Sequence, residues 1–115
     1  MPTVRTGDIR FRRLVSVSAT DSLTTVYTVP ENYVAEVEKI TICNTDTSYR
    51  YVTLKLGDRA VFSGTRLGPA GGAESTIDWG EVGHYLHASE TIKVSADVTG
   101  VVDIYVSGGE RRDQS

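Results

Sequence analysis

Apolar and polar residues alternate along most of the chain, in short runs separated by turn-forming residues. In the first run, residues 8–18, Ile9, Phe11, Val15 and Val17 share one parity and polar residues take most of the other. Successive side chains of a β-strand point to opposite faces of a sheet, so this alternation predicts a strand with one buried face.

The same period of two recurs in the next two runs. Residues 24–29 form a run that stops at Pro30, which has no N–H to donate to a strand ladder. In residues 33–44 the apolar positions change parity near Glu38 and Lys39. An extra residue in one strand produces such a change, so we expect a β-bulge there.

Six further segments read as strands, and the longest stretches between them are rich in glycine or polar residues. Residues 68–72 combine glycines with Pro69 and predict a loop, whereas residues 108–115 are polar and show no period. We expect that tail to fray unless a partner orders it. The segments are residues 50–56 and 59–63, which predict a hairpin, residues 74–79, the short and ambiguous residues 82–86, and residues 91–96 and 101–107, which predict a final hairpin.

Eight or nine short strands at this spacing predict an all-β protein with a single domain. An antiparallel β-sandwich, a jelly roll and a small barrel all fit, and we favour the sandwich or jelly roll. Val and Thr outnumber Leu and Ala, which agrees with strands, and 115 residues suffice for one core. We expect an N-terminal arm at residues 1–7, the β-domain at residues 8–108 and a C-terminal tail at residues 109–115.

The overall charge argues against nucleic acid as a partner. Twelve Lys and Arg against fifteen Asp and Glu give a net charge of −3, whereas a protein that binds the phosphate backbone is usually basic. No apolar run approaches the length of a membrane span, and the N-terminus lacks the apolar core of a secretion signal. We therefore expect a soluble protein that binds neither nucleic acid nor membrane.

Arginines cluster near both ends of the chain and are candidates for contacts with an acidic partner. Arg10 and Arg12 have a simpler explanation as the solvent side of an edge strand, where charge prevents aggregation. Two exposed aromatic candidates, Tyr49 and Tyr51, share one parity, and such rings either anchor an interface or cover the end of a thin core. The candidate arginines are Arg5, Arg10, Arg12, Arg13, Arg111 and Arg112.

Signals for catalysis are few. His84 and His87 are three residues apart, so on a strand their rings point to opposite faces, and a shared metal would need a turn and a further carboxylate. Cys43 is the single cysteine and lies in an apolar stretch, which favours a packing role. The sequence lacks a phosphate loop, a nucleophile elbow and a Cys-x-x-Cys pair. We expect no enzyme activity and no cofactor.

Three segments follow one another in a suggestive order: Thr-Val-Tyr-Thr-Val-Pro at residues 25–30, Ile-Thr-Ile-Cys-Asn-Thr at residues 40–45, and Val-Thr-Leu-Lys-Leu at residues 52–56. Thr-Ile-Lys-Val-Ser-Ala at residues 91–96 and a last strand closing on Ser107 and Gly108 complete the series. Over residues 23–108 this order resembles the small β-sandwich structural proteins of tailed bacteriophages. The resemblance carries over no catalytic or ligand residues, because those proteins are assembly components.

The resemblance implies a virion structural protein made in the host bacterial cytoplasm. It would decorate the capsid or act as a head or tail accessory, contacting the major capsid protein or neighbouring virion proteins, and form a homo-oligomer. An alternative is a carbohydrate- or receptor-binding module at a tail tip, with Tyr49, Tyr51 or Trp79 stacking on a glycan. A third hypothesis, a metal-dependent enzyme on a cupin-like roll, depends on His84 and His87.

Overall fold

The computed structural model describes residues 10–113, with side chains from residue 13 onward, and every element in this range is a strand. No helix among these residues is long and apolar enough to cross a membrane. The eight strands are β1 (Arg10–Ser18), β2 (Thr24–Thr28), β3 (Tyr33–Asn44), β4 (Arg50–Leu56), β5 (Arg59–Leu67), β6 (Thr76–Leu86), β7 (Thr91–Ala96) and β8 (Val102–Arg112).

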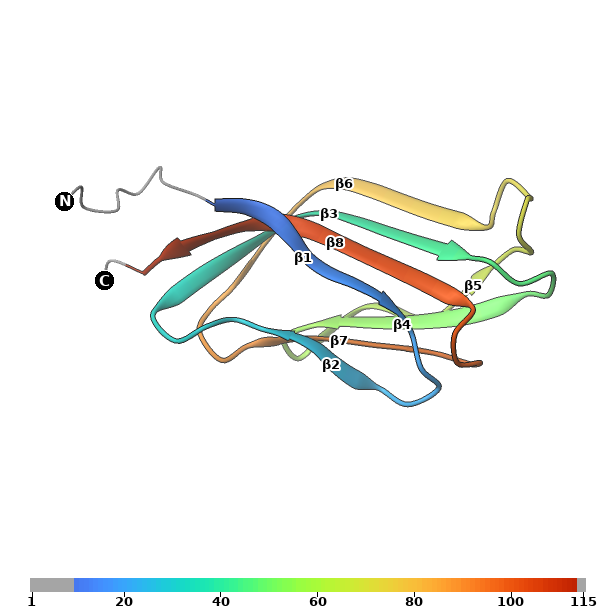
Figure 1. The fold of residues 1–115 in the computed structure, drawn as a ribbon, viewed down its shortest axis with the longest axis horizontal. Coiled ribbons are helices and arrows are strands. Elements are labelled where there is room, and N and C mark those ends of the chain that lie inside the picture. Colours follow the sequence, from blue (N-terminus) through green and yellow to red (C-terminus); the bar gives the residue numbers. More distant parts are fainter. Residues whose placement is uncertain (1–9, 114–115) are drawn as a thin grey trace.

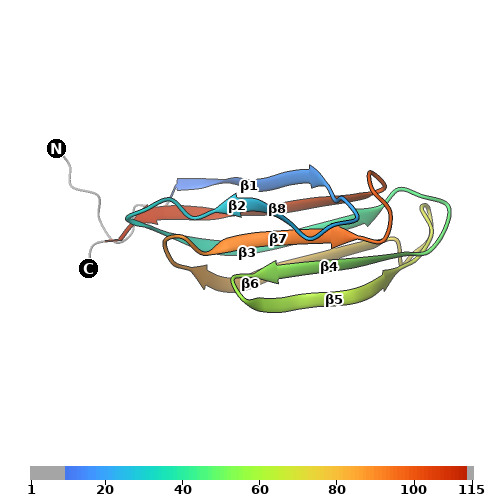
Figure 2. The same cartoon turned by 90° about the horizontal axis from the view of Figure 1, so that it is seen from below.

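The strands form two antiparallel four-stranded sheets, in the orders β1-β8-β3-β6 and β2-β7-β4-β5. β1 pairs with β8, β2 with β7, β3 with β6 and β4 with β5, as though one long hairpin had been rolled up. This nesting is the topology of a jelly roll. Figure 1 shows the two sheets as layers, and Figure 2 shows β2, β7, β4 and β5 side by side. The all-β sandwich expected from the sequence is confirmed.

The core lies between the sheets and consists of the inward positions of the alternating strands. Val52, Leu54 and Leu56 of β4 are at most 2% exposed, while Tyr51 on the same strand is 45% exposed. The alternation predicted for residues 50–56 is thus confirmed residue by residue. The largest fully buried side chains are Ile40, Ile42, Leu54, Leu56, Leu67, Leu86, Ile92 and Ile104.

The bulge expected near Glu38 and Lys39 is present. Against β8 the register of β3 shifts between Val37 and Lys39, which pair with consecutive residues, so Glu38 is the extra residue of this pair of strands. Against β6 the shift has the opposite sense, because residues 81–83 of β6 lie opposite Glu38 alone. A second shift, between Arg13 and Val15 in β1, buries Leu14 and Val15 together. The uninterrupted parity expected for the first strand was therefore wrong at this point, because a bulge lets adjacent residues face the core.

Three strands are longer than the sequence predicts. The two segments expected at residues 74–79 and 82–86 are joined in one strand, β6, which begins at Thr76. Its irregular middle contains Glu81 at a φ of 58° and Gly83 at 65°. β5 continues to Leu67. β8 continues through residues 108–112, where Arg112 pairs with Tyr33, so the expectation of a frayed tail was wrong there. This segment shows no alternation of apolar residues, but it is ordered because its backbone pairs with β1 on one side and β3 on the other. Residues 1–9, which include the predicted arm, and residues 114–115 lie outside the described range.

Candidate interaction surfaces

Three tyrosines each lie under an arginine guanidinium: Tyr49 and Tyr105 are exposed, and Tyr33 is half-buried against the core. The distance from the guanidinium carbon to the ring centroid is 5.7 Å for Arg13 over Tyr105, 4.8 Å for Arg66 over Tyr49 and 5.8 Å for Arg112 over Tyr33. All three lie within the range of a cation–π contact, which holds the planar groups in defined positions. Tyrosine and arginine are also the residues in which the centres of protein interfaces are enriched.

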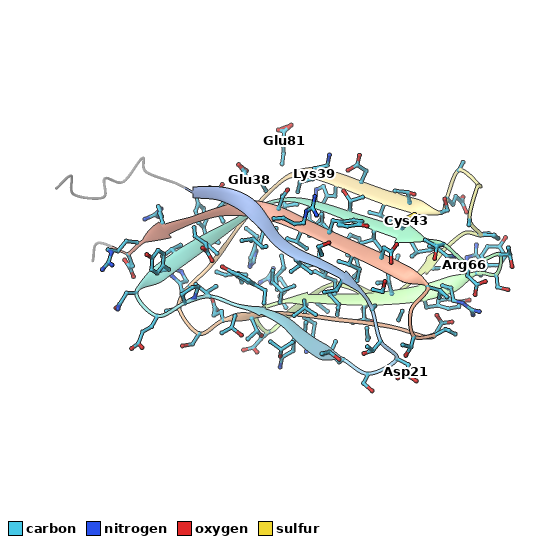
Figure 3. The ribbon with its side chains drawn as sticks, in the orientation of Figure 1. Asp21, Glu38, Lys39, Cys43, Arg66 and Glu81 are labelled. Atoms are coloured by element: carbon cyan, nitrogen blue, oxygen red, sulfur yellow. The ribbon has the colours of Figure 1, made fainter. Side chains whose placement is uncertain are left out.

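The best-formed of these pairs lies at the start of β4. Tyr49 and Tyr51 are 50% and 45% exposed, as predicted, and Arg66 of β5 is the cross-strand partner of Tyr51. Arg66 was missed by the sequence analysis, since only the register between β4 and β5 places it beside two residues from another part of the chain. Figure 3 shows Arg66 at the end of the roll, far from Glu81 and Lys39.

A polar network fixes the loop that carries Tyr49. The side-chain amide of Asn44, a buried residue, donates to the carbonyl oxygens of Ser48 at 2.9 Å and Gly68 at 2.8 Å. The Arg50 guanidinium donates to an Asp46 carboxylate oxygen at 2.6 Å. The hydrogen bond from Arg50, with a second from the backbone N–H of Thr47, lowers the pKa of Asp46. Tyr49 therefore lies on a loop whose two ends are held by hydrogen bonds from Asn44 and Arg50.

Arg50 also reaches the neighbouring hairpin. Its guanidinium lies 3.6 Å from a carboxylate oxygen of Asp97, and the backbone N–H of Tyr51 donates to that carboxylate at 3.1 Å. Because Arg50 lies between two carboxylates, its charge is compensated within the chain. Arg50 is therefore a structural residue, whereas Arg66 stacks on an exposed ring.

The arginines predicted near the chain ends do not gather with Tyr49 and Tyr51. Arg13 and Tyr105 lie on the outer side of the β1-β8-β3-β6 sheet. Arg111 and Arg112 lie where β8 ends, at the opposite end of the roll from the β3–β4 loop (Figure 1). The Arg10 and Arg12 side chains and the whole of Arg5 lie outside the described part of the chain, although the backbones of Arg10 and Arg12 pair with β8.

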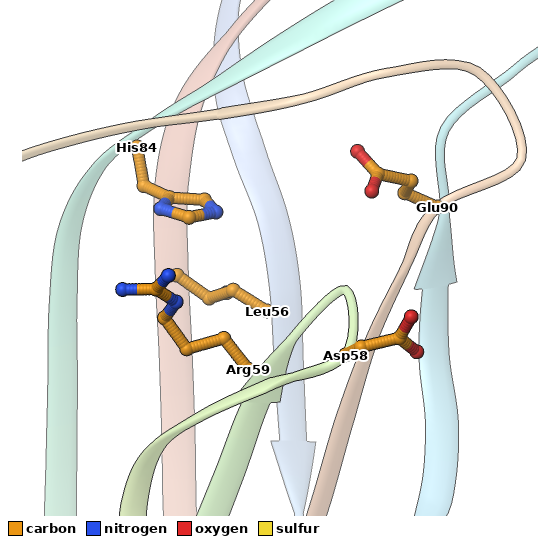
Figure 4. A pocket seen from close by; sticks show the side chains of 5 residues that line it. All are labelled: Leu56, Asp58, Arg59, His84 and Glu90. Carbon is orange, nitrogen blue, oxygen red and sulfur yellow. The ribbon is translucent and has the colours of Figure 1, made fainter.

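A shallow, open hollow of about 400 Å³ lies at the same end of the roll as the end of β8. Figure 4 shows the His84 ring facing the Arg59 guanidinium, with the carboxylates of Asp58 and Glu90 across the hollow. Glu90 already has a structural role, because its carboxylate accepts the backbone N–H of His87 at 2.7 Å. The hollow therefore contains charged groups of both signs, and one of its carboxylates closes a turn.

His84 and His87 do not form the core of a metal site. His84 lines the hollow, whereas His87 lies in the turn beyond β6. Within residues 13–113 no three His, Cys, Asp or Glu side chains are grouped so as to hold a metal ion. The metal-dependent alternative therefore has no ligand set among these residues.

Trp79 contributes to the closure of the sandwich. Its ring meets Phe62 edge-on, with the centroids 6.0 Å apart and the planes at 85°. Phe62 lies on β5 and Trp79 on β6, which are the edge strands of the two sheets. The pair therefore bridges the open side of the roll, although 39% of Trp79 is still exposed.

Comparison with known proteins identifies no family for this chain. No protein-family model matches the chain, and no curated protein matches it. The surfaces described above are therefore interpreted from their own chemistry.

Proposed function

We propose that the chain is a non-enzymatic structural protein of a tailed bacteriophage particle. In this proposal it decorates the capsid or serves as a head or tail accessory, and it acts through repeated contacts with copies of itself and neighbouring virion proteins. The sequence resemblance over residues 23–108 supports the proposal, and so does the jelly roll, an architecture that also builds viral capsid proteins.

The observation that carries the proposal is the distribution of three Arg–Tyr pairs, two on exposed tyrosines and one on the half-buried Tyr33. Arg66 with Tyr49, Arg13 with Tyr105 and Arg112 with Tyr33 lie on separate parts of the roll. Catalytic groups converge on one concave site, whereas an assembly subunit needs several contact surfaces, one for each neighbour. Modest contacts then add up over many copies, because each engaged surface raises the effective concentration of the next.

Counting the protein in purified particles tests this function. Quantitative mass spectrometry of particles from a phage that encodes the chain should find it as a stoichiometric component. On the order of hundreds of copies would indicate a capsid decoration protein, and about a dozen would indicate a neck or tail ring. Absence from washed particles would overturn the proposal.

A second candidate function is carbohydrate or receptor binding at a tail tip. It is favoured by the exposure of Tyr49 and Tyr51 on a braced loop and strand, because sugars stack on exposed rings and jelly rolls occur in lectins. Here a glycan array should give a signal that disappears in Tyr49→Ala and Tyr51→Ala and persists in Tyr105→Ala. An array with no signal for the unmodified chain would exclude the glycan version.

A further inference from the structure

The two sheets differ sharply in charge. The strands of the β1-β8-β3-β6 sheet contain both acidic and basic residues, whereas the strands of the β2-β7-β4-β5 sheet contain no Asp or Glu. This is unexpected in a chain with a net charge of −3. The basic residues of the second sheet are Arg50, Lys55, Arg59, Arg66 and Lys93.

Lys55 and Lys93 belong to the outer face of this sheet. Their neighbours along the strands, Leu54 and Leu56 on β4 and Ile92 on β7, are buried in the core. Alternate residues of a strand point to opposite faces, so the lysines are directed away from the core. The salt bridges among the described side chains join Lys39 to Asp78 and Arg50 to Asp46 and Asp97. None of them neutralises Lys55 or Lys93.

The two lysines also oppose each other directly. In the register of β4 with β7, Lys55 pairs with Lys93. Residues in such positions have Cβ atoms about 5 Å apart, and like charges there destabilise the sheet. The isolated chain therefore carries a repulsion on this face, which a carboxylate supplied from outside would relieve.

Aromatic anchors adjoin the lysines. Tyr51 lies on the same strand and the same face as Lys55, about 13 Å away at a rise of about 3.3 Å per residue. Arg66 lies opposite Tyr51 and stacks on Tyr49. The face thus combines uncompensated positive charge with rigid tyrosines, which supply apolar contact area at low entropic cost.

Carboxylates border this face at both ends and limit the kind of anion that fits. At the Tyr51 end lie Asp46 and Asp97, which already engage Arg50. At the other end Asp58 and Glu90 line the hollow beyond Lys55. A long polyanion such as a nucleic acid would extend past the lysines and meet these carboxylates, whereas a compact acidic protein patch would not.

We propose that the outer face of the β2-β7-β4-β5 sheet, with Lys55, Lys93, Arg66, Tyr49 and Tyr51, is a docking surface for a carboxylate-rich surface of a different protein. The uncompensated Lys55–Lys93 pair beside the Tyr–Arg anchor carries the inference. The identity of the partner as a neighbouring virion subunit rests on the proposed function. The preference of this surface for carboxylates does not depend on that function.

The surface itself is tested by titrating the isotope-labelled full chain with a short Glu-rich peptide and with its Gln counterpart. Backbone amide shifts should map to residues 51–55 and 93–95, with no response to the Gln peptide. Lys55→Glu and Lys93→Glu should each weaken binding of the Glu-rich peptide about tenfold. Either variant replaces a like-charge pair by an opposite one, so loss of the fold is not expected to confuse the result. Lys39→Glu, on the other sheet, is the matched control.

Several results would overturn the proposal. Shifts that map elsewhere, equal weakening by Lys39→Glu, or tighter binding of oligo-dT than of the Glu-rich peptide would each do so. Analytical sedimentation checks for a second copy of the chain as the occupant. If the unmodified chain self-associates and Lys55→Glu abolishes this self-association, the proposal of a different partner protein is overturned.

An assay in particles separates this inference from the proposed function. Lys55→Glu should be lost from purified particles while Lys39→Glu is retained. Incorporation of Lys55→Glu at the normal copy number would overturn the docking surface. If the unmodified chain is itself absent from particles, the virion function fails, and the peptide titration alone decides whether the surface binds acidic proteins.

Discussion

Gly108 of β8 lies against the backbone carbonyl of Glu36 in β3 so closely that a Cβ on Gly108 would overlap the carbonyl oxygen. The same Cβ would lie 3.2 Å from the backbone nitrogen of Glu38, the extra residue of the β3 bulge. Two central strands therefore approach each other where one of them bulges, and only glycine fits between them.

Replacing Gly108 tests this close approach. Gly108→Ala should lower the free energy of unfolding by about 1–3 kcal/mol, because backbone atoms must move to admit the methyl group. Urea denaturation followed by circular dichroism measures the change. Gly80→Ala is the matched control, since a Cβ at Gly80 in β6 meets nothing within 4 Å. Equal stability of the two variants would show that the contact between β8 and the bulge is loose.

The Lys55–Lys93 pair on the outer face of the β2-β7-β4-β5 sheet predicts opposite effects on stability and on binding. Replacing one lysine by glutamate should stabilise the fold although it weakens the binding of an acidic partner. Lys55→Glu should raise the free energy of unfolding by about 0.5 kcal/mol, because the introduced carboxylate would face Lys93 across the β4–β7 register. Lys39→Glu should not stabilise, since it removes a partner of Asp78. Thermal unfolding at low salt checks both, and the gain should shrink as salt screens the charges.

A hydrogen bond between the sheets gives a third prediction. The Tyr27 hydroxyl on β2 donates to the carboxylate of Glu110 on β8, which is only 8% exposed. Tyr27→Phe removes a donor from a buried carboxylate and should cost about 1–3 kcal/mol of unfolding free energy. Tyr105→Phe, at an exposed ring on the outer side of β8, should cost little. A small, equal effect of both variants in urea denaturation would show that the bond contributes nothing net.

Asp46 gives the fold a defined acid sensitivity. Arg50 holds the pKa of Asp46 below its ordinary value of 3.8 in the folded chain. A carboxyl whose pKa is lower in the folded state stabilises the fold above the unfolded pKa, and this stabilisation is lost as the pH falls through the folded pKa. Asp46→Asn should therefore lower the melting temperature at neutral pH, with the deficit shrinking below about pH 4. Asp21→Asn, in the exposed β1–β2 turn, is the control, and a pH-independent deficit in Asp46→Asn would contradict the prediction.

Local alternation was enough to predict the all-β class, most of the strands and the inward faces of β4, β7 and β8. Each of those signals depends on neighbouring residues, because the period of two is a property of a single strand. The bulge at Glu38 was also predicted from the sequence, because it interrupts the period of two within a single strand. The exposure of Tyr49 and Tyr51 followed from the same parity.

Pairing between strands was predicted only in part. The hairpin expected from residues 50–56 and 59–63 is present as β4 and β5. The final hairpin expected from residues 91–96 and 101–107 was wrong, because β7 and β8 belong to different sheets. The continuation of β8 through Gly108 and Gly109 depends on hydrogen bonds from β1 and β3, which no local period records. Likewise, Arg66 meets Tyr49, Lys55 meets Lys93 and Phe62 meets Trp79 only because the roll aligns distant segments. The sequence by itself determined which residues face inward, because burial follows from hydrophobicity and the strand period. Only the tertiary structure decided which charges and rings share a surface, because those contacts depend on sheet order and register.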